Sequence, residues 1–192
     1  KSGSKEQNIL AKQGDDLRID WGYFYMVAGK ENTAYSVGNS TELRKNFVNG
    51  TLNSASLEGE DSNGNMALVR SHGKVKNVTD KIMLGYDDIY SIQYFGTNLR
   101  PYWNSKGDRT IEAEMLAAYN EYDKLLARCY AFDKKLMEDA SAAGGKEYAE
   151  LCALAYRQSI AAHKLVEAPN GDLLWLSKEN NSNGCINTVD LT

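Results

Sequence analysis

Two groups of polar residues have the side-chain types that hydrolytic chemistry needs. Asp87 and Asp88 are neighbours in an aromatic-rich stretch, and a second group fills residues 178–190. A carboxylate can polarise a water molecule or hold a substrate's amino group, and a carboxamide can bind a carboxylate or stabilise an oxyanion. We therefore predict a polar substrate site. The predicted catalytic residues are Asp87, Asp88, Glu179 and Asp190, and the predicted substrate-binding residues are Tyr86, Asn180, Asn183 and Asn187.

Both groups also have an ordinary structural interpretation. Neighbouring residues of a strand point to opposite faces of a sheet, so Asp87 and Asp88 can share one site only if the backbone bends at Gly85. A segment as rich in Asn, Ser and Gly as residues 178–190 is typical of turns. The sequence leaves both interpretations open.

Other catalytic patterns find little support. The sequence has no G-x-S-x-G elbow, no H-E-x-x-H motif and no phosphate-binding glycine loop. Ser2 and Lys5 have the S-x-x-K spacing of serine amidases, but no helix is predicted to hold them together. Cys152 and His163 share a predicted helix face, yet about 16 Å of helix axis would separate them. The three cysteines have no CxxC spacing, so we expect free thiols, no metal and no cofactor.

The composition narrows the class of protein. The chain has 192 residues, of which 42% are hydrophobic and 25% are charged, and its net charge of −4 includes no basic stripe. A nucleic-acid surface is therefore not expected. No apolar run approaches the ~20 residues that span a membrane. The first residue is Lys, and no signal peptide follows it, so we expect an excised piece of a larger protein.

The pattern before residue 107 is that of short strands. Apolar residues alternate with other residues over 17–27, and two further β-rich runs occupy 66–69 and 88–95. Turn residues separate these runs, and residues 41–47 suit a short helix capped by Thr41. We therefore predict that residues 1–107 are the later part of an antiparallel β-sandwich.

After residue 107 the apolar period becomes 3.5 residues. One stripe predicts a helix of about 30 residues that begins after Asp108 as its N-cap and ends at Gly144 and Gly145. A second helix is expected over 147–166, followed by a short apolar strand over 173–176. We therefore predict that residues 108–192 form a helical hairpin with a following loop. Together with the strands before residue 107, this predicts the α+β fold class for the chain. The stripe consists of Ile111, Met115, Ala118, Tyr122, Leu125, Cys129, Phe132 and Leu136.

Several long stretches are distinctive, and they occupy residues 84–95, 99–103, 156–158, 161–165 and 177–190. These stretches resemble the glutaminase A family, a family of exported bacterial and fungal proteins. The resemblance implies a β-sandwich followed by an (α/α)6 toroid of six helical hairpins, with residues 108–192 as the first hairpin. It also implies a periplasmic or extracellular location.

The resemblance implies a function in which this chain takes part. A glutaminase hydrolyses L-glutamine to L-glutamate and ammonia, and a toroid site needs groups from several hairpins, so we expect these residues alone to be inactive. Expected partners are a small substrate, the remaining domains of the parent chain and a second copy bound through the exposed hairpin face. Two alternatives stay open: a glycosidase-like protein, in which Trp103 and Trp175 stack on sugars or pack in the core, and a non-catalytic structural or binding module.

Overall fold

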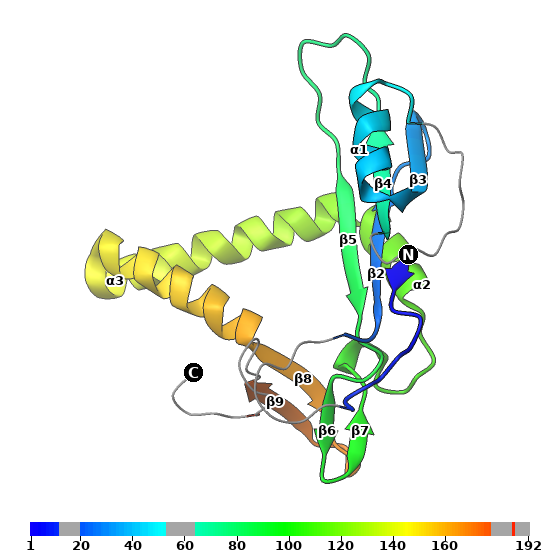
Figure 1. Ribbon diagram of the computed structural model, residues 1–192. Coiled ribbons are helices and arrows are strands. Elements are labelled where there is room, and N and C mark those ends of the chain that lie inside the picture. Colours follow the sequence, from blue (N-terminus) through cyan, green and yellow to red (C-terminus); the bar gives the residue numbers. More distant parts are fainter. Residues whose placement is uncertain (12–19, 53–63, 178–185, 187–192) are drawn as a thin grey trace. The chain divides into compact units, whose positions relative to one another are not determined.

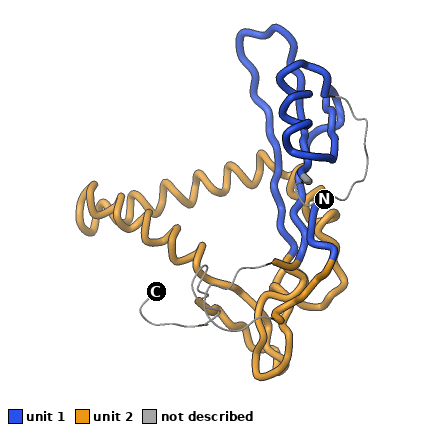
Figure 2. The backbone as a smooth tube through the Cα atoms, viewed as in Figure 1, with its two compact units in different colours: residues 1–5, 22–87 blue, residues 6–21, 88–192 orange. Residues whose placement is uncertain are grey.

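The structure is a computed structural model of the 192-residue chain, and it describes residues 1–11, 20–52, 64–177 and 186. The backbone divides into two compact units, which Figure 2 shows in different colours. The first unit comprises residues 1–5 and 22–87, and the second comprises residues 6–21 and 88–192.

The described residues of the first unit form two small antiparallel sheets and one helix. A three-stranded sheet has the order β1-β2-β5, and its register pairs Tyr23 with Asp87 and Ala28 with Ile82. A two-stranded sheet pairs β3 with β4, and α1 packs on it (Figure 1). The elements are β1 Ser2–Gly3, β2 Tyr23–Ala28, β3 Thr33–Asn39, α1 Ser40–Val48, β4 Gly64–Arg70 and β5 Ile82–Asp87.

The short helix α1 confirms the prediction for 41–47, but its cap differs. Asn39 is the N-cap, and its Oδ1 accepts a hydrogen bond from the Thr41 backbone N–H at 3.0 Å. Thr41 is therefore inside the first turn. Asn suits the cap because its short side chain satisfies a backbone N–H that the helix leaves unpaired.

The strands of the first unit confirm the period-two pattern in part. The structure places β2 at the end of the predicted run 17–27 and β4 over the predicted run 66–69, while residues 12–19 lie outside the described part of the chain. Strands β3 and β5 were not predicted. The predicted strand over 88–95 is wrong at its beginning, because β5 ends at Asp87 and the next strand begins only at Ile92.

The second unit combines two β-hairpins with a helical hairpin. Strand β6 pairs with β7, and β8 pairs with β9, both antiparallel. Between these ribbons the chain forms one 3-10 turn and two helices (Figure 1). The elements are β6 Ile92–Tyr94, β7 Thr97–Leu99, η1 Tyr102–Asn104, α2 Ile111–Asn120, α3 Tyr122–Ala162, β8 His163–Glu167 and β9 Leu173–Ser177.

The helical hairpin is confirmed, with its turn where the sequence places it. Helix α3 consists of two arms that meet at Gly145, whose φ of 83° and ψ of −178° are not helical. In Figure 1 the first arm runs away from α2 and the second returns to β8. The single 30-residue helix of the prediction is divided at Glu121 into α2 and the first arm. The N-cap of α2 is Thr110 and not Asp108, since the Thr110 side chain accepts from the Ala113 N–H.

The second predicted helix is too long. The helix in the structure ends at Ala162. The next five residues form β8, which pairs with β9 in a register that places Leu165 opposite Trp175. Asn170 and Gly171 lie in the connecting turn, and Gly171 has a φ of 89°. An Asn-Gly pair between two apolar runs is a strong hairpin signal because it supplies residues that tolerate positive φ. The prediction of a strand over 173–176 is confirmed.

The core of the second unit lies beneath the β8–β9 ribbon. Ile92, Leu99 and Val166 are buried, with exposed fractions of 1%, 6% and 0%. The apolar stripe of the helices is buried only where it begins, at Ile111 and Met115, whereas Phe132 is 47% exposed. The hydrophobic residues packed around the core are Tyr94, Leu174, Leu176 and Ile186.

Candidate functional site

The predicted site residues fall in three places. Tyr86 and Asp87 belong to β5 in the first unit, and Asp88 is the next residue of the chain but belongs to the second unit. The remaining five lie outside the described residues, and so their roles stay predictions. They are Glu179, Asn180, Asn183, Asn187 and Asp190.

Strand β5 places Tyr86 and Asp87 beside β2. Tyr86 is 45% exposed and pairs with Phe24, whereas Asp87 is half-buried and pairs with Tyr23. Gly85 pairs regularly with Tyr25, so the backbone does not leave the sheet at Gly85. The strand ends instead after Asp87, and Ile89 adopts a φ of 60°. A positive φ is unusual for a β-branched residue and marks the sharp turn that follows Asp88.

Asp88 is buried and held by several donors. Its carboxylate is 5% exposed, and Oδ2 accepts from the Ser91 hydroxyl at 2.7 Å and from Lys164 Nζ at 3.2 Å. Its backbone carbonyl accepts from the Trp21 indole N–H at 2.8 Å. A buried charge persists in a protein when it is paired and hydrogen-bonded in this way. The geometry favours a positional role for Asp88 over the activation of a solvent water.

The partners of Asp88 come from separated parts of the sequence. Ser91 is fully buried, and its backbone N–H donates to the Leu99 carbonyl at 2.9 Å, which fixes the turn against β7. Lys164 is on β8 and reaches the carboxylate across 76 residues of sequence. Sequence reasoning missed Lys164 because it placed that residue on a helix.

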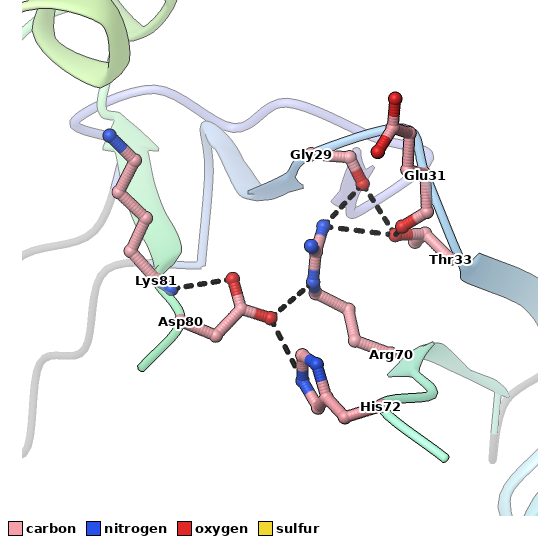
Figure 3. A network of polar contacts seen from close by, with 7 residues as sticks. All are labelled: Gly29, Glu31, Thr33, Arg70, His72, Asp80 and Lys81. Atoms are coloured by element: carbon pink, nitrogen blue, oxygen red, sulfur yellow. Dashed lines mark hydrogen bonds and ion pairs between the residues drawn. The ribbon is translucent and has the colours of Figure 1, made fainter. Parts of the chain in front are cut away.

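A second polar cluster lies in the first unit and was not predicted. The Asp80 carboxylate pairs with Arg70 and, at 3.1 Å, with His72 Nε2 (Figure 3). Its other oxygen accepts from the Lys81 backbone N–H at 2.8 Å. That backbone hydrogen bond, together with the Arg70 guanidinium, lowers the pKa of Asp80 from its ordinary value. The only signal in the sequence is that these charges flank the connection between β4 and β5.

The Asp80 cluster joins the ends of two strands. Arg70 ends β4 and also donates to the Gly29 carbonyl and to Thr33 Oγ1, which lie just after β2 and at the start of β3 (Figure 3). Asp80 stands two residues before β5. A histidine beside a carboxylate can serve as an oriented general base. The hydrogen bonds of Arg70 and Asp80 to main-chain atoms instead favour a structural role, in which the cluster holds the two ends of the connection between β4 and β5 together.

Exposed aromatic side chains mark a third candidate surface. The rings of His163 and Trp175 stack with their centroids 5.1 Å apart and their planes 9° from parallel. Trp175 is 47% exposed, so it does not belong to the core. An exposed, oriented indole can stack on a flat ligand face.

The two arms of α3 enclose an open apolar groove of about 690 Å³. Phe132 from the first arm and Tyr156 from the second line it, and their rings are in contact with their centroids 5.2 Å apart. Its lining includes Asp133, Leu136, Met137, Arg157 and Ile160. An exposed apolar surface of this kind is typical of a site for another protein segment.

Metal and membrane sites find no support in the described part of the chain. Among those residues, no three His, Cys, Asp or Glu side chains are placed to hold a metal ion. No helix within the same ranges is long and apolar enough to cross a bilayer. Cys129 and Cys152 are free thiols, Cys129 is exposed, and Cys185 lies outside the described residues.

Comparisons with known proteins agree with this architecture. Residues 1–139 match a domain of unknown function, DUF5127, and residues 145–192 match the glutaminase A six helical-hairpin domain. The chain is 28% identical to Glutaminase A of Aspergillus oryzae, over 91% of this chain and 27% of that protein. It therefore spans about a quarter of the length of that relative. No solved structure matches the chain. Since the two family models cover nearly all of its residues in the order β-rich domain then helical hairpin, the chain belongs to the glutaminase A family.

Proposed function

We propose that the protein containing this chain hydrolyses the side-chain amide of L-glutamine and releases L-glutamate and ammonia. The observation that carries the proposal is the similarity to Glutaminase A over 91% of the chain, together with the match to the six helical-hairpin domain. The reaction needs a water made nucleophilic and groups that hold the amino acid's two charges. The polar residues of this chain include both kinds.

The proposed roles follow from side-chain chemistry. Glu179 and Asp190 polarise the water or hold the substrate's ammonium group, and Asn180, Asn183 and Asn187 hold its carboxylate. Tyr86 and Asp87 lie on β5, where Tyr86 is exposed. We propose Tyr86 as a substrate-binding residue and Asp87 as a catalytic residue. Asp88 acts indirectly, since its carboxylate is already bound to Ser91 and Lys164.

We propose further that these 192 residues are inactive alone and that the rest of a longer chain completes the site. The exposed groove between the arms of α3 supports this, because its apolar residues suit the helices of a neighbouring hairpin. In their absence, the same face binds a second copy. The family resemblance also leads us to propose that the protein acts outside the cytoplasm, which fractionation of cells that make it would test.

The experiment is a glutaminase assay on the longer protein that contains this chain. Ammonia release from L-glutamine is measured for the unaltered protein and for Glu179→Gln, with Glu31→Gln as the matched control, since Glu31 is exposed in the connection between β2 and β3. We expect Glu179→Gln to reduce kcat by ~100-fold or more, as loss of a general base does. An unaltered protein without activity refutes the function. Full activity in Glu179→Gln refutes only the role of that residue.

A second candidate function is carbohydrate binding, and one observation favours it. Trp175 is exposed and held by its stack on His163, an arrangement that suits a sugar ring. Titration of the same protein with soluble glycans, followed by indole fluorescence, separates the two functions. Saturable quenching by a glycan, without glutamine hydrolysis, would favour the carbohydrate function. The third alternative, a non-catalytic module, predicts neither result.

A further inference from the structure

The boundary between the two family matches does not coincide with a boundary in the fold. The first match ends at residue 139 and the second begins at residue 145, yet the second unit combines residues 88–192. Strands β8 and β9 from the second match pack on β6, β7 and η1 from the first. We infer that residues 88–104 and 163–177, here called the junction, fasten the start of the region that matches the helical-hairpin domain to the last strands before the helices, through the positioning ion pair of Asp88 and Lys164.

The apolar part of the junction comes from both matches. Val166 on β8 is fully buried against Ile92 and Leu99, and its backbone forms an isolated bridge with Pro101. Leu174 and Leu176 on β9 pack against the same cluster. Because side chains alternate along a strand, the face of the ribbon that carries Val166 also carries Lys164. One face of the ribbon therefore supplies both the apolar contact and the charge.

The polar part of the junction gives the contact its specificity. The Asp88 carboxylate is 5% exposed and the Lys164 side chain is 36% exposed, so the two ends of the ion pair differ in their access to water. Removal of Lys164 leaves a buried carboxylate that, among the described side chains, keeps the Ser91 hydroxyl as its donor, and this loss is costly. Removal of the charge on Asp88 leaves an ammonium that can turn towards solvent. The two substitutions should therefore have unequal effects.

A second ion pair lies at the edge of the junction. Lys106 Nζ pairs with Glu167, and this hydrogen bond lowers the pKa of Glu167 and raises that of Lys106. The Lys106 side chain is 69% exposed. Exposed pairs contribute little to stability because water and salt screen them. Lys106 is a suitable control, since it lies two residues beyond the first segment of the junction and its side chain is mostly exposed.

The junction also brings together the two ends of the long segment that contains α2 and α3. The backbone leaves the junction at Asn104 and returns at His163 after α2 and both arms of α3. Closing such a loop has an entropic cost that contacts at its base must offset. If these contacts are lost, the returning arm of α3 keeps its helical hydrogen bonds but loses its fixed end. The junction is therefore a contact that fixes the returning end of the helical hairpin.

The test is amide hydrogen exchange on the 192-residue chain. The variants are Lys164→Met, Asp88→Asn, their double variant and the control Lys106→Met. We expect Lys164→Met to speed exchange in β8 and β9 by about tenfold or more, and Asp88→Asn to have a smaller effect. The double variant should exchange more slowly than Lys164→Met, because no unpaired charge stays buried. Lys106→Met should leave exchange in the ribbon close to that of the unaltered chain.

Three results would overturn the inference. The first is exchange in β8 and β9 that Lys164→Met leaves unchanged. The second is an additive double variant, which would show that the two residues are not coupled. The third is an equal acceleration in the paired strands β2 and β5 of the first unit, which would indicate general unfolding. If Lys164→Met does not fold, Asp88→Asn and the double variant carry the same comparison, and a folded double variant supports the inference. None of these readouts depends on glutaminase activity.

Discussion

At the scale of single residues, Asp80 and Asp88 show how differently two carboxylates of one chain are used. Asp88 is buried with one lysine and one hydroxyl, whereas Asp80 is shared among Arg70, His72 and a backbone N–H near the surface. Each arrangement has its own measurable consequence. For Asp88 this is the coupling across the junction, and for Asp80 it is the dependence of stability on pH.

The first unit should lose stability in acid through Asp80. Its donors lower the pKa of Asp80 in the folded state, so the unfolded chain binds a proton first as the pH falls. The contribution is present above about pH 4, the ordinary range of an Asp, and is lost as the pH falls towards the lowered value. Urea unfolding at a series of pH values measures it.

Asp80→Asn provides the comparison, because it keeps the shape of the side chain and removes the titration. The difference in unfolding free energy between the unaltered chain and this variant should shrink as the pH is lowered below about 4. A difference that stays constant over that range would contradict the assigned cause. The other carboxylates titrate in both proteins and so cancel in the comparison.

At the scale of elements, the turn of the helical hairpin depends on one backbone conformation. Gly145 has a φ of 83°, and a Cβ added there would meet no atom within 4 Å. The cost of Gly145→Ala is therefore conformational, and we expect a loss of about 1–3 kcal/mol in the unfolding free energy. Urea unfolding followed by helical circular dichroism measures this loss.

Gly38→Ala is the matched control for the turn. Gly38 is in β3, it has no positive φ, and a Cβ there would also meet open space. The same substitution should change stability by less than about 1 kcal/mol, because the unfolded chain loses freedom without strain in the fold. Equal losses in the two variants would show that the conformation at Gly145 has no special role.

The elements differ in how far their sequence determines them. The helical hairpin was predictable because its apolar period and its Gly144–Gly145 turn are local signals. The identity of β8 was not, because 163–167 continues a helical pattern until its pairing with β9 is known. Asn170 and Gly171 carried the missing signal. Strand β5 was overlooked for a related reason, since it depends on pairing with β2 across more than fifty residues of sequence.

The candidate site also has features that local sequence reveals and features that only the tertiary structure reveals. The residue types at Tyr86, Asp87 and Asp88 could be selected from the sequence, because paired carboxylates beside an aromatic residue are visible there. Their separate roles could not, because the contact of Asp88 with Lys164 depends on tertiary structure. The Asp80 cluster escaped prediction for the same reason, since its charges meet only when β4 and β5 have formed.

At the scale of the whole molecule, the exposed groove between the arms of α3 should determine association. We expect the 192-residue chain to form dimers at high concentration, because Phe132 and its apolar neighbours leave an open surface. Phe132→Glu should shift the chain towards monomers, since it places a charge in the groove. Sedimentation velocity over a range of concentrations measures the change.

Phe95→Glu is the control for association. Phe95 is 93% exposed at the turn between β6 and β7, and it does not line the groove. The same substitution there should leave the dimer unchanged. A chain that is monomeric at every concentration, or one that both variants dissociate equally, would exclude the groove as the surface of association.

The order of the two units along the chain limits how the protein can be dissected. The backbone passes between them at residues 5–6, 21–22 and 87–88, because the second unit includes the early segment 6–21. A single cleavage at any of these points leaves at least one product with residues of both units, and cleavage at 21–22 leaves two. Trp21 belongs to that early segment, and its indole donates to the carbonyl of Asp88. Truncation of the gene at any one of these boundaries therefore leaves both units represented in at least one product, and a clean separation needs the two segments of each unit to be joined to each other.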